Sequence, residues 1–268
     1  MKNTRSEVLT THALLIVAAL IAVFPFVSIV LSALQGSGSG GAPTLSNFTE
    51  AWTRGGFGSA LLSSAFVTIM VVTVTVAVSC LAGFAMAQMR VPGGRIMLGL
   101  MLLGLVLPYE VTVLPLYQML EGWGLIDTYA ALILPQIGLS VPLGVFWMRA
   151  FFASVPGELI EAARIDGASN FTAFRKVLLP IAAPAIATLM TILFLFTWNE
   201  FLLALILVPQ NEAVQTAPLA LSFFSGASRS ADPNITAAAA VLVALPIVLA
   251  YVLLQRRLIS GLTEGAVK

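Results

Sequence analysis

Five long stretches without a charged residue constrain this chain more than any other feature of its sequence. Each stretch reaches or exceeds the roughly 20 residues that a helix needs to cross a bilayer. Hydrophobic residues make up 59% of the chain and charged residues 9%, a composition that excludes an ordinary soluble domain. We therefore predict an all-α integral membrane protein. The five stretches are Ala13 to Leu34, Gly55 to Met89, Thr128 to Met148, Val177 to Asn199 and Pro233 to Gln255.

A sixth span is predicted from the distribution of charge. The uncharged stretch from Ile96 to Tyr109 gives about 21 Å of helix before Glu110 interrupts it. If this segment did not cross, a chain with a cytoplasmic N-terminus would place Arg149 and Arg164 outside, against the tendency of cytoplasmic loops to hold Lys and Arg. We predict a single transmembrane domain over residues 1–268 with spans at about 13–34, 60–87, 96–118, 128–151, 182–207 and 235–255.

Basic residues predict the orientation of these spans. With six crossings and both termini cytoplasmic, only Arg54 and Arg229 fall on the outer side. The other 11 of the 13 Lys and Arg residues fall inside, as short cytoplasmic loops favour. They are Lys2, Arg5, Arg90, Arg95, Arg149, Arg164, Arg175, Lys176, Arg256, Arg257 and Lys268.

The segment 152–181 is a charged, amphipathic island between two apolar spans. We predict a short helix from about Pro156 to Asp166, ended by Gly167 in the left-handed conformation. Ser169 or Asn170 then caps a second helix. This pattern predicts a helix-turn-helix elbow; an amphipathic pair lying on the membrane surface is the alternative. One face of the second helix should carry Phe171, Phe174 and Leu178.

Motifs in and around this island resemble a known family. The run Glu161-Ala162-Ala163-Arg164-Ile165-Asp166-Gly167, followed by Leu179-Pro180, resembles the cytoplasmic EAA loop by which permeases of binding-protein-dependent ATP-binding-cassette (ABC) importers contact their ATPases. The chain is also similar to the shorter permease of maltose-type carbohydrate importers. That similarity is carried by Val91-Pro92-Gly93, Gly124 to Tyr129, Trp198-Asn199-Glu200-Phe201 and Gly261 to Lys268, with Glu264 departing from the usual small residue.

The resemblance implies a fold, a location and a set of partners. The fold is that of a type I ABC importer permease, with six transmembrane helices and a cytoplasmic coupling loop at 152–181. The location is the bacterial plasma (inner) membrane, with the chain passing through the lipid several times. The partners are a second homologous permease, two ATP-binding ATPase subunits and an extracytoplasmic sugar-binding protein; no nucleic-acid partner is expected.

No ATP chemistry is expected in this chain. The sequence lacks a G-x-x-x-x-G-K-[ST] phosphate loop, so ATP and Mg should be bound by the partner ATPases and this chain should need no cofactor. A single cysteine, Cys80, and a single histidine, His12, cannot build a disulfide framework or a metal site. We therefore predict a transport subunit without catalytic or metal-binding residues.

The resemblance assigns the ATPase-coupling residues. Glu161 is expected to contact the ATPase groove, and Gly167 to fix the elbow. The full set is Glu161, Ala162, Ala163, Asp166 and Gly167.

Topology, by contrast, places Glu110 and Glu200 in the outer part of the bilayer core, about 21 and about 26 Å along their helices. With Trp198 and Asn199 they are candidates for a translocation path, because intramembrane acids generally face a cavity or a partner. Alternatively, both acids pair with helix dipoles or loops at the external interface.

A second class of function fits the composition. A secondary carrier or channel for a small polar solute, working alone, would also span the membrane six times. Such a carrier is expected to show an internal repeat with discontinuous helices and paired ion-binding acids near the midplane, and no clear repeat is visible. Sugar import rests on the resemblance, which leaves disaccharides, oligosaccharides and glycerol-phosphate-type solutes open as cargo.

Overall fold

The computed structural model describes residues 5–36, 42–226 and 232–266, with side chains from 9 to 253. Lys2, Arg229 and Lys268 of the charge pattern, and the side chains of Arg5, Arg256, Arg257 and Glu264, therefore lie outside the described part of the chain. The described residues are almost entirely helical and divide into two compact units. The first comprises residues 1–58 and 220–246, the second residues 59–219 and 247–268. The prediction of a single transmembrane domain stays a prediction.

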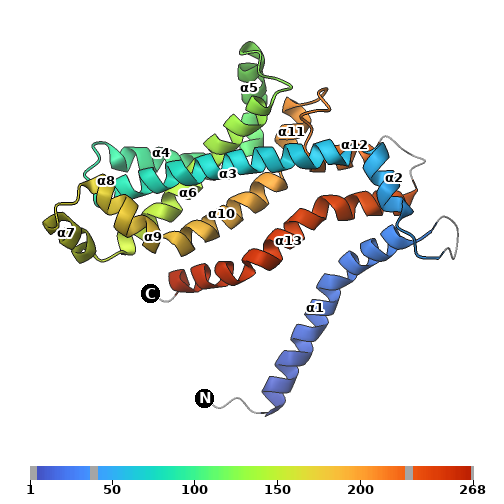
Figure 1. Cartoon of the computed structure of the whole chain (residues 1–268), viewed down its shortest axis with the longest axis horizontal. Coiled ribbons are helices and arrows are strands. Elements are labelled where there is room, and N and C mark those ends of the chain that lie inside the picture. Colours follow the sequence, from blue (N-terminus) through green and yellow to red (C-terminus); the bar gives the residue numbers. More distant parts are fainter. Residues whose placement is uncertain (1–4, 37–41, 227–231, 267–268) are drawn as a thin grey trace. The chain divides into compact units, whose positions relative to one another are not determined.

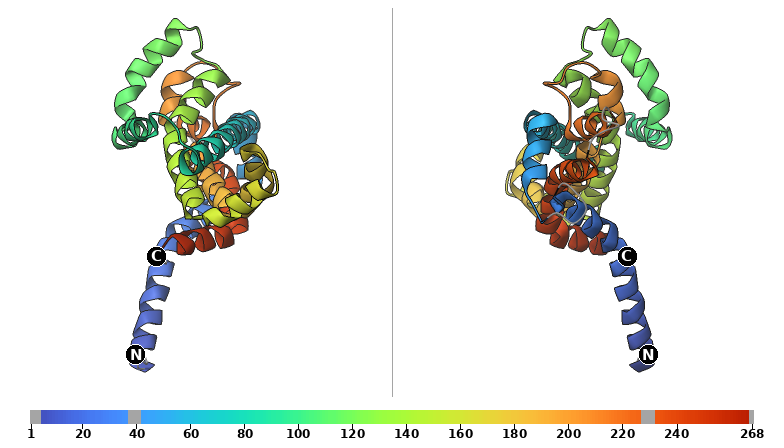
Figure 2. Two further views of the ribbon diagram at one scale, coloured as in Figure 1. Left: turned by 90° about the vertical axis from the view of Figure 1, so that its left-hand side faces the viewer. Right: turned by 90° about the vertical axis from the view of Figure 1, so that its right-hand side faces the viewer.

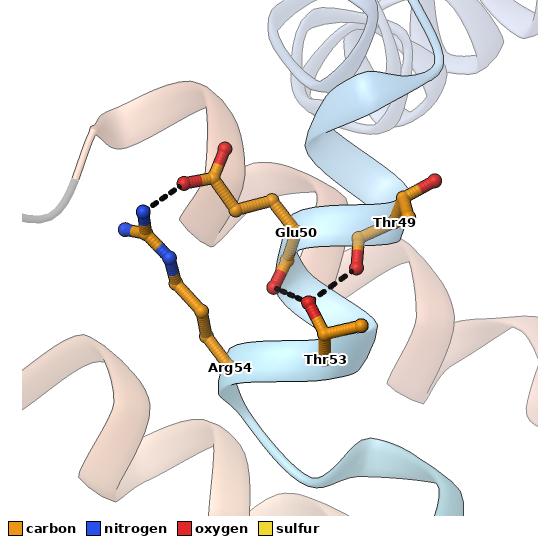
Figure 3. Close-up of polar contacts among 4 residues, drawn as sticks. All are labelled: Thr49, Glu50, Thr53 and Arg54. Carbon is orange, nitrogen blue, oxygen red and sulfur yellow. Dashed lines mark hydrogen bonds and ion pairs between the residues drawn. The ribbon is translucent and has the colours of Figure 1, made fainter.

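The first unit contains α1 (Arg5–Leu34) and the short helix α2 (Ser46–Arg54) (Figure 1). The Asn47 side chain, which is 2% exposed, donates hydrogen bonds to the carbonyls of Ala33 and Gln35 and so fastens α2 to the end of α1. Polar side chains of α2 interact along the helix. Arg54 and Glu50 form an ion pair one turn apart, and the Thr53 hydroxyl donates to the backbone carbonyls of Thr49 and Glu50 (Figure 3). This unit also holds the ends of three helices that continue into the second unit: α3 (Phe57–Gln88), α12 (Ala217–Gly226) and α13 (Pro233–Ala266).

The second unit carries the features that bear on function. Its helices are the rest of α3, then α4 (Gly94–Val106), α5 (Tyr109–Gly122), α6 (Tyr129–Ser154), α7 (Gly157–Ile165), α8 (Asn170–Ala173), the π-helix η1 (Phe174–Leu178), α9 (Leu179–Ile181), α10 (Ala183–Trp198) and α11 (Leu202–Leu207). One apolar core, containing Phe84, Met148, Phe152, Phe174 and Leu178, joins α3, α6 and η1. A second core, containing Val113, Ala131 and Leu203, joins α5, α6 and α11.

Small residues let α3 and α6 approach closely. A Cβ atom at Gly83 of α3 would lie 2.8 Å from the Arg149 backbone nitrogen of α6, and a Cβ at Gly144 of α6 would collide with the Ser79 hydroxyl. Close contact of backbones at small residues is how helices associate in lipid, where no hydrophobic effect drives them together. The two helices therefore form a tightly packed pair.

By length and apolar composition the described helices offer four unbroken candidate spans, and up to six if each of two sharply bent pairs counts as one span. Four helices are long and apolar enough to cross a membrane unbroken, within α1, α3, α6 and α13. The third span, expected as one helix over 96–118, is instead α4 and α5, which meet at 101° (Figures 1 and 2). Pro108 causes the break, because proline lacks the amide that would continue the helix and holds Leu107 in an extended conformation.

The fifth span also differs from the continuous helix expected over 182–207. The second bent pair is residues 170–181 with α10, which meet at 74°, and a separate break follows α10. The helix α10 ends at Trp198, and α11 begins only at Leu202. The Asn199 side chain turns back to donate a 2.7 Å hydrogen bond to the Leu195 carbonyl, satisfying a group at the end of α10. Local side-chain hydrogen bonds of this kind compete with continuation of the helix. Both broken spans are sites where polar backbone groups become available inside the predicted membrane region.

Candidate coupling elbow and transport pocket

The turn after α7 has the geometry that its sequence predicts. Gly167 adopts a φ of +81°, a left-handed conformation that glycine tolerates best. Its amide donates to the Arg164 carbonyl at 3.0 Å, and the Ala168 amide donates to the Ala163 carbonyl at 2.9 Å. These two bonds define a Schellman motif, which satisfies the last carbonyls of the helix. The predicted stop at Gly167 is confirmed.

A second helix begins immediately after this turn. The Ser169 hydroxyl accepts a hydrogen bond from the Thr172 amide and caps α8, so Ser169 and not Asn170 is the N-cap. The Arg164 guanidinium donates to the Asn170 side-chain oxygen at 3.1 Å and braces the two helices across the turn. The helix-turn-helix elbow predicted over residues 152–181 is therefore present, and we call it the elbow.

The elbow is anchored to the second unit through aromatic side chains. Phe174 of η1 packs against Phe84 of α3 and Phe152 of α6, with ring centroids 5.0 and 6.1 Å apart. Pro180 explains why the helix widens to π geometry here. Proline has no amide hydrogen, so Pro180 cannot donate the α-helical hydrogen bond to the Lys176 carbonyl four residues earlier. Rigid packing at its base makes the elbow part of the body formed by α3 and α6.

One predicted face of the elbow is only partly buried. Phe174 and Leu178 are buried, whereas Phe171 is 63% exposed. The face predicted to carry all three side chains is therefore covered by protein at Phe174 and Leu178 and open at Phe171. Phe171 still lies beside Phe174, with ring centroids 6.3 Å apart.

The proposed coupling residues do not all face the same way. Glu161, Ala162, Asp166 and Gly167 are exposed, whereas Ala163 is buried with Ile160 against the core of the unit. No hydrogen bond or ion pair to the Glu161 carboxylate is formed by other residues in the described part of the chain. Its oxygens are therefore available to another molecule.

Exposed apolar side chains accompany these charges, a feature that the motif did not reveal. Ile165 is 86% exposed, Phe171 63% and Leu159 42%. Exposed large apolar side chains on a charged projection are typical of a contact surface. The signal in the sequence was the failure of Ile165 to follow the apolar period set by Ile160 and Ala163.

A pocket of about 750 Å³ lies within the second unit, where the breaks of the third and fifth spans meet α6. It is lined by the end of α4 and start of α5 on one side, and by the end of α10 and start of α11 on another. Leu139 and Leu143 of α6 and Phe196 of α10 supply apolar surface. Its polar lining residues are Tyr109, Glu110, Gln136, Ser140, Thr197, Asn199 and Glu200.

The pocket brings together three of the four candidate path residues. Glu110, in the first turn of α5, Asn199 and Glu200 all line it, although 90 residues separate the two acids. The Glu200 carboxylate also accepts a 2.8 Å hydrogen bond from the Leu203 amide at the start of α11. Trp198 does not line the pocket: it is 4% exposed and stacks on Phe194, with ring centroids 5.6 Å apart.

These contacts accommodate both interpretations of the two acids. Each lies at a helix N-terminus, where a negative charge is stabilised by the helix dipole and by free amides. Each also lines the pocket, so capping a helix does not remove the carboxylate from the cavity. Glu110 and Glu200, which the sequence places at a similar depth in the membrane, therefore also share a cavity.

Gln136 was missed by the sequence analysis. It lies in the middle of an apolar span, is 6% exposed and lines the pocket, and its side-chain oxygen has no hydrogen-bond partner among the described residues. A buried amide oxygen without a partner is costly, so such groups usually serve a ligand or water. The signal was present in the sequence as an amide side chain inside a long charge-free stretch.

Comparison with known proteins gives a consistent family. Residues 79–264 match the protein family of binding-protein-dependent transport system inner membrane components. The trehalose transport system permease protein SugB of Mycobacterium tuberculosis is 43% identical over 157 residues, or 58% of this chain and 57% of SugB. The diacetylchitobiose uptake system permease protein NgcG of Streptomyces coelicolor is 30% identical over 95% of this chain and 87% of its own length.

Solved structures agree on the fold. A chain from the crystal structure of a bacterial ABC transporter involved in the import of the acidic polysaccharide alginate superposes with a TM-score of 0.76, covering 96% of this chain and 99% of that one. The two sequences are 20% identical, so this structural similarity supports the fold alone. The elbow, the broken spans and the family match lead to one conclusion: the chain belongs to the inner membrane components of binding-protein-dependent transport systems, with the fold of an ABC importer permease.

Proposed function

We propose that this chain is a permease subunit of an ATP-driven importer for sugars, paired with a second homologous permease in a bacterial inner membrane. The observation that carries this proposal is the elbow, a rigid projection with exposed charged and apolar side chains that follows the family's coupling motif. SugB and NgcG, whose names refer to trehalose and diacetylchitobiose, support sugar as the class of cargo. An extracytoplasmic binding protein would deliver that cargo.

The elbow is the contact with the ATPase subunits. Both chain termini and the elbow lie on the cytoplasmic side in this proposal, as the distribution of Lys and Arg favours. Glu161 and Asp166 offer charged contacts, and Ile165 and Phe171 offer apolar ones. Gly167 holds the turn, and Ala163, being buried, contributes packing within the elbow. ATP and Mg are bound by the partner subunits.

The helix α6 links the elbow to the pocket. Gln136 and Ser140 line the pocket from the first half of α6, which ends at Ser154. The elbow begins directly after α6 (Figure 1). About 27 Å of helix separates Gln136 from Ser154. Because Phe152 fixes the elbow to the end of α6, a displacement of the elbow is transmitted as a rigid-body movement of α6 and α3. The pocket is the proposed path for the solute.

Uptake should depend on ATP hydrolysis and not on the proton gradient. In cells carrying the complete importer, orthovanadate is expected to stop ATP hydrolysis and accumulation of the transported sugar, whereas a protonophore is not expected to stop uptake while ATP is maintained. Measuring uptake of labelled sugars under both treatments, together with co-purification of a nucleotide-binding subunit, tests this proposal. Uptake that follows the proton gradient, in a chain that purifies without an ATPase, would instead establish the secondary carrier.

A further inference from the structure

The charge of the pocket restricts what it can accept. Two carboxylates, Glu110 and Glu200, line it, and no Lys or Arg is found among the described residues of its lining. Within the described part of the chain, neither pocket acid forms an ion pair with a basic side chain. Charges in a partly enclosed, apolar cavity are screened less than on an open surface.

The remaining polar groups of the lining include acceptors for a ligand that donates hydrogen bonds. Gln136 is 6% exposed, and its side-chain oxygen is enclosed by protein without a hydrogen-bond partner among the described residues. Asn199 donates one of its two side-chain N–H groups to the Leu195 carbonyl, and the Glu200 carboxylate can only accept. The pocket therefore presents carboxylate oxygens as acceptors and the hydroxyls of Tyr109, Ser140 and Thr197 as groups that both donate and accept, beside leucine and phenylalanine surface suited to C–H groups.

We propose that this pocket admits uncharged, hydroxyl-rich solutes and excludes anionic ones, making this subunit a charge filter in the path. Sugar hydroxyls donate strong, charge-assisted hydrogen bonds to carboxylates. A phosphate or uronate group would instead bring a third negative charge beside two that have no counter-ion. A volume of about 750 Å³ lies within the range of about 300–1,000 Å³ typical of small-molecule sites.

This inference deepens the proposed function and rests on it. Cargo charge varies among importers of this fold, since one solved structure comes from an importer of the acidic polysaccharide alginate. Of the solutes left open by the sequence, neutral disaccharides and oligosaccharides fit the pocket. Glycerol-phosphate-type solutes do not fit, because they carry the charge that Glu110 and Glu200 repel.

Thiol labelling measures the filter without requiring transport. A cysteine is introduced by Ser140→Cys in a Cys80→Ala background, in membrane vesicles carrying the complete importer; Ser140 lines the pocket and Cys80 is buried. Three methanethiosulfonate reagents of similar size are compared: one neutral with a hydroxyethyl group, one cationic and one anionic. Each rate is divided by the rate of the same reagent on a free thiol. Leu139→Cys, at a lining residue that is 37% exposed, provides a second reporter if the first variant does not assemble.

The anionic reagent is expected to label at least about tenfold more slowly than the neutral one, the ratio that modest repulsion by the two acids would produce. Combining the reporter with Glu110→Gln and Glu200→Gln should remove most of this deficit. Glu121→Gln is the matched control, because Glu121 is an exposed acid on α5 outside the pocket lining, and it should leave the deficit unchanged.

Two results would overturn the filter. One is equal normalised labelling by the neutral and anionic reagents; the other is a deficit that persists in the double glutamine variant. Absence of labelling by the neutral reagent at both reporter positions would also overturn it, since the pocket would then not admit an uncharged solute. None of these results touches ATP-dependent uptake, so failure of the filter and failure of the proposed importer function are distinguishable.

Discussion

Gly167→Pro is expected to abolish transport while leaving the permease in the membrane. Proline holds φ near −65°, whereas Gly167 requires +81°, and proline also removes the amide that donates to the Arg164 carbonyl. The Schellman turn therefore cannot form, and α7 loses its fixed direction relative to α8. Substrate uptake and the ATP hydrolysis stimulated by the binding protein should both fall to background, measured in vesicles with equal amounts of permease.

The same substitution ten residues earlier is the matched control. Gly157 is the first residue of α7, a position where proline is favoured because its missing amide has no partner within the helix. A Cβ atom added at Gly157 would also meet no other atom within 4 Å. Gly157→Pro should keep transport near the wild-type level. Wild-type uptake in Gly167→Pro would show that the conformation of this turn is not needed for coupling.

Glu161→Lys is expected to uncouple the permease from its ATPases. The side chain is exposed on the elbow and has no hydrogen bond or ion pair in the described structure, so the reversal of charge should leave the fold intact. If the Glu161 carboxylate contacts basic groups in an ATPase groove, the lysine places a positive charge against those groups. Such a juxtaposition of like charges weakens binding at an interface by several kcal/mol. The measurements are uptake and retention of the nucleotide-binding subunit during purification.

Glu121→Lys provides the comparison for this variant. Glu121 is also exposed, and it lies in the last turn of α5, which places it away from the elbow in the sequence and in the proposed topology. Its reversal changes the net charge of the chain by the same amount and should preserve both uptake and association. If both variants behaved alike, the effect would belong to net charge and not to a contact at Glu161.

The elbow could be predicted in detail because its signals are local. Gly167 ends α7 through its own backbone conformation, and Ser169 caps α8 through its own hydroxyl, so neither needs information from distant parts of the chain. The orientation of Ala163 needed tertiary packing: its neighbour Ala162 is exposed, and the motif treats the two alike. The exposure of Phe171 also depends on tertiary packing, because its neighbour Phe174 is the one that packs against Phe84 and Phe152.

The pocket could not be predicted from the sequence because it is built by two broken spans. Glu110 and Glu200 were recognised as unusual, but a continuous helix over 96–118 hid the 101° angle between α4 and α5. Hydropathy identifies membrane segments but does not predict where they bend. A proline does not settle the matter either, because transmembrane helices tolerate proline when neighbouring groups satisfy the freed backbone carbonyls. Pro108 gave a local indication of a break, whereas the convergence of that break with Asn199 and Gln136 is a tertiary property.

Photo-crosslinking from the elbow tests the central claim most directly. A photoreactive amino acid replaces Ile165, which is 86% exposed on α7, and a matched variant carries it at Leu114, which is 67% exposed on α5. Illumination of the assembled importer should join position 165, and not position 114, to a nucleotide-binding subunit. An importer that hydrolyses ATP and transports sugar, yet yields no such adduct from position 165, would contradict the assignment of the elbow as the coupling contact.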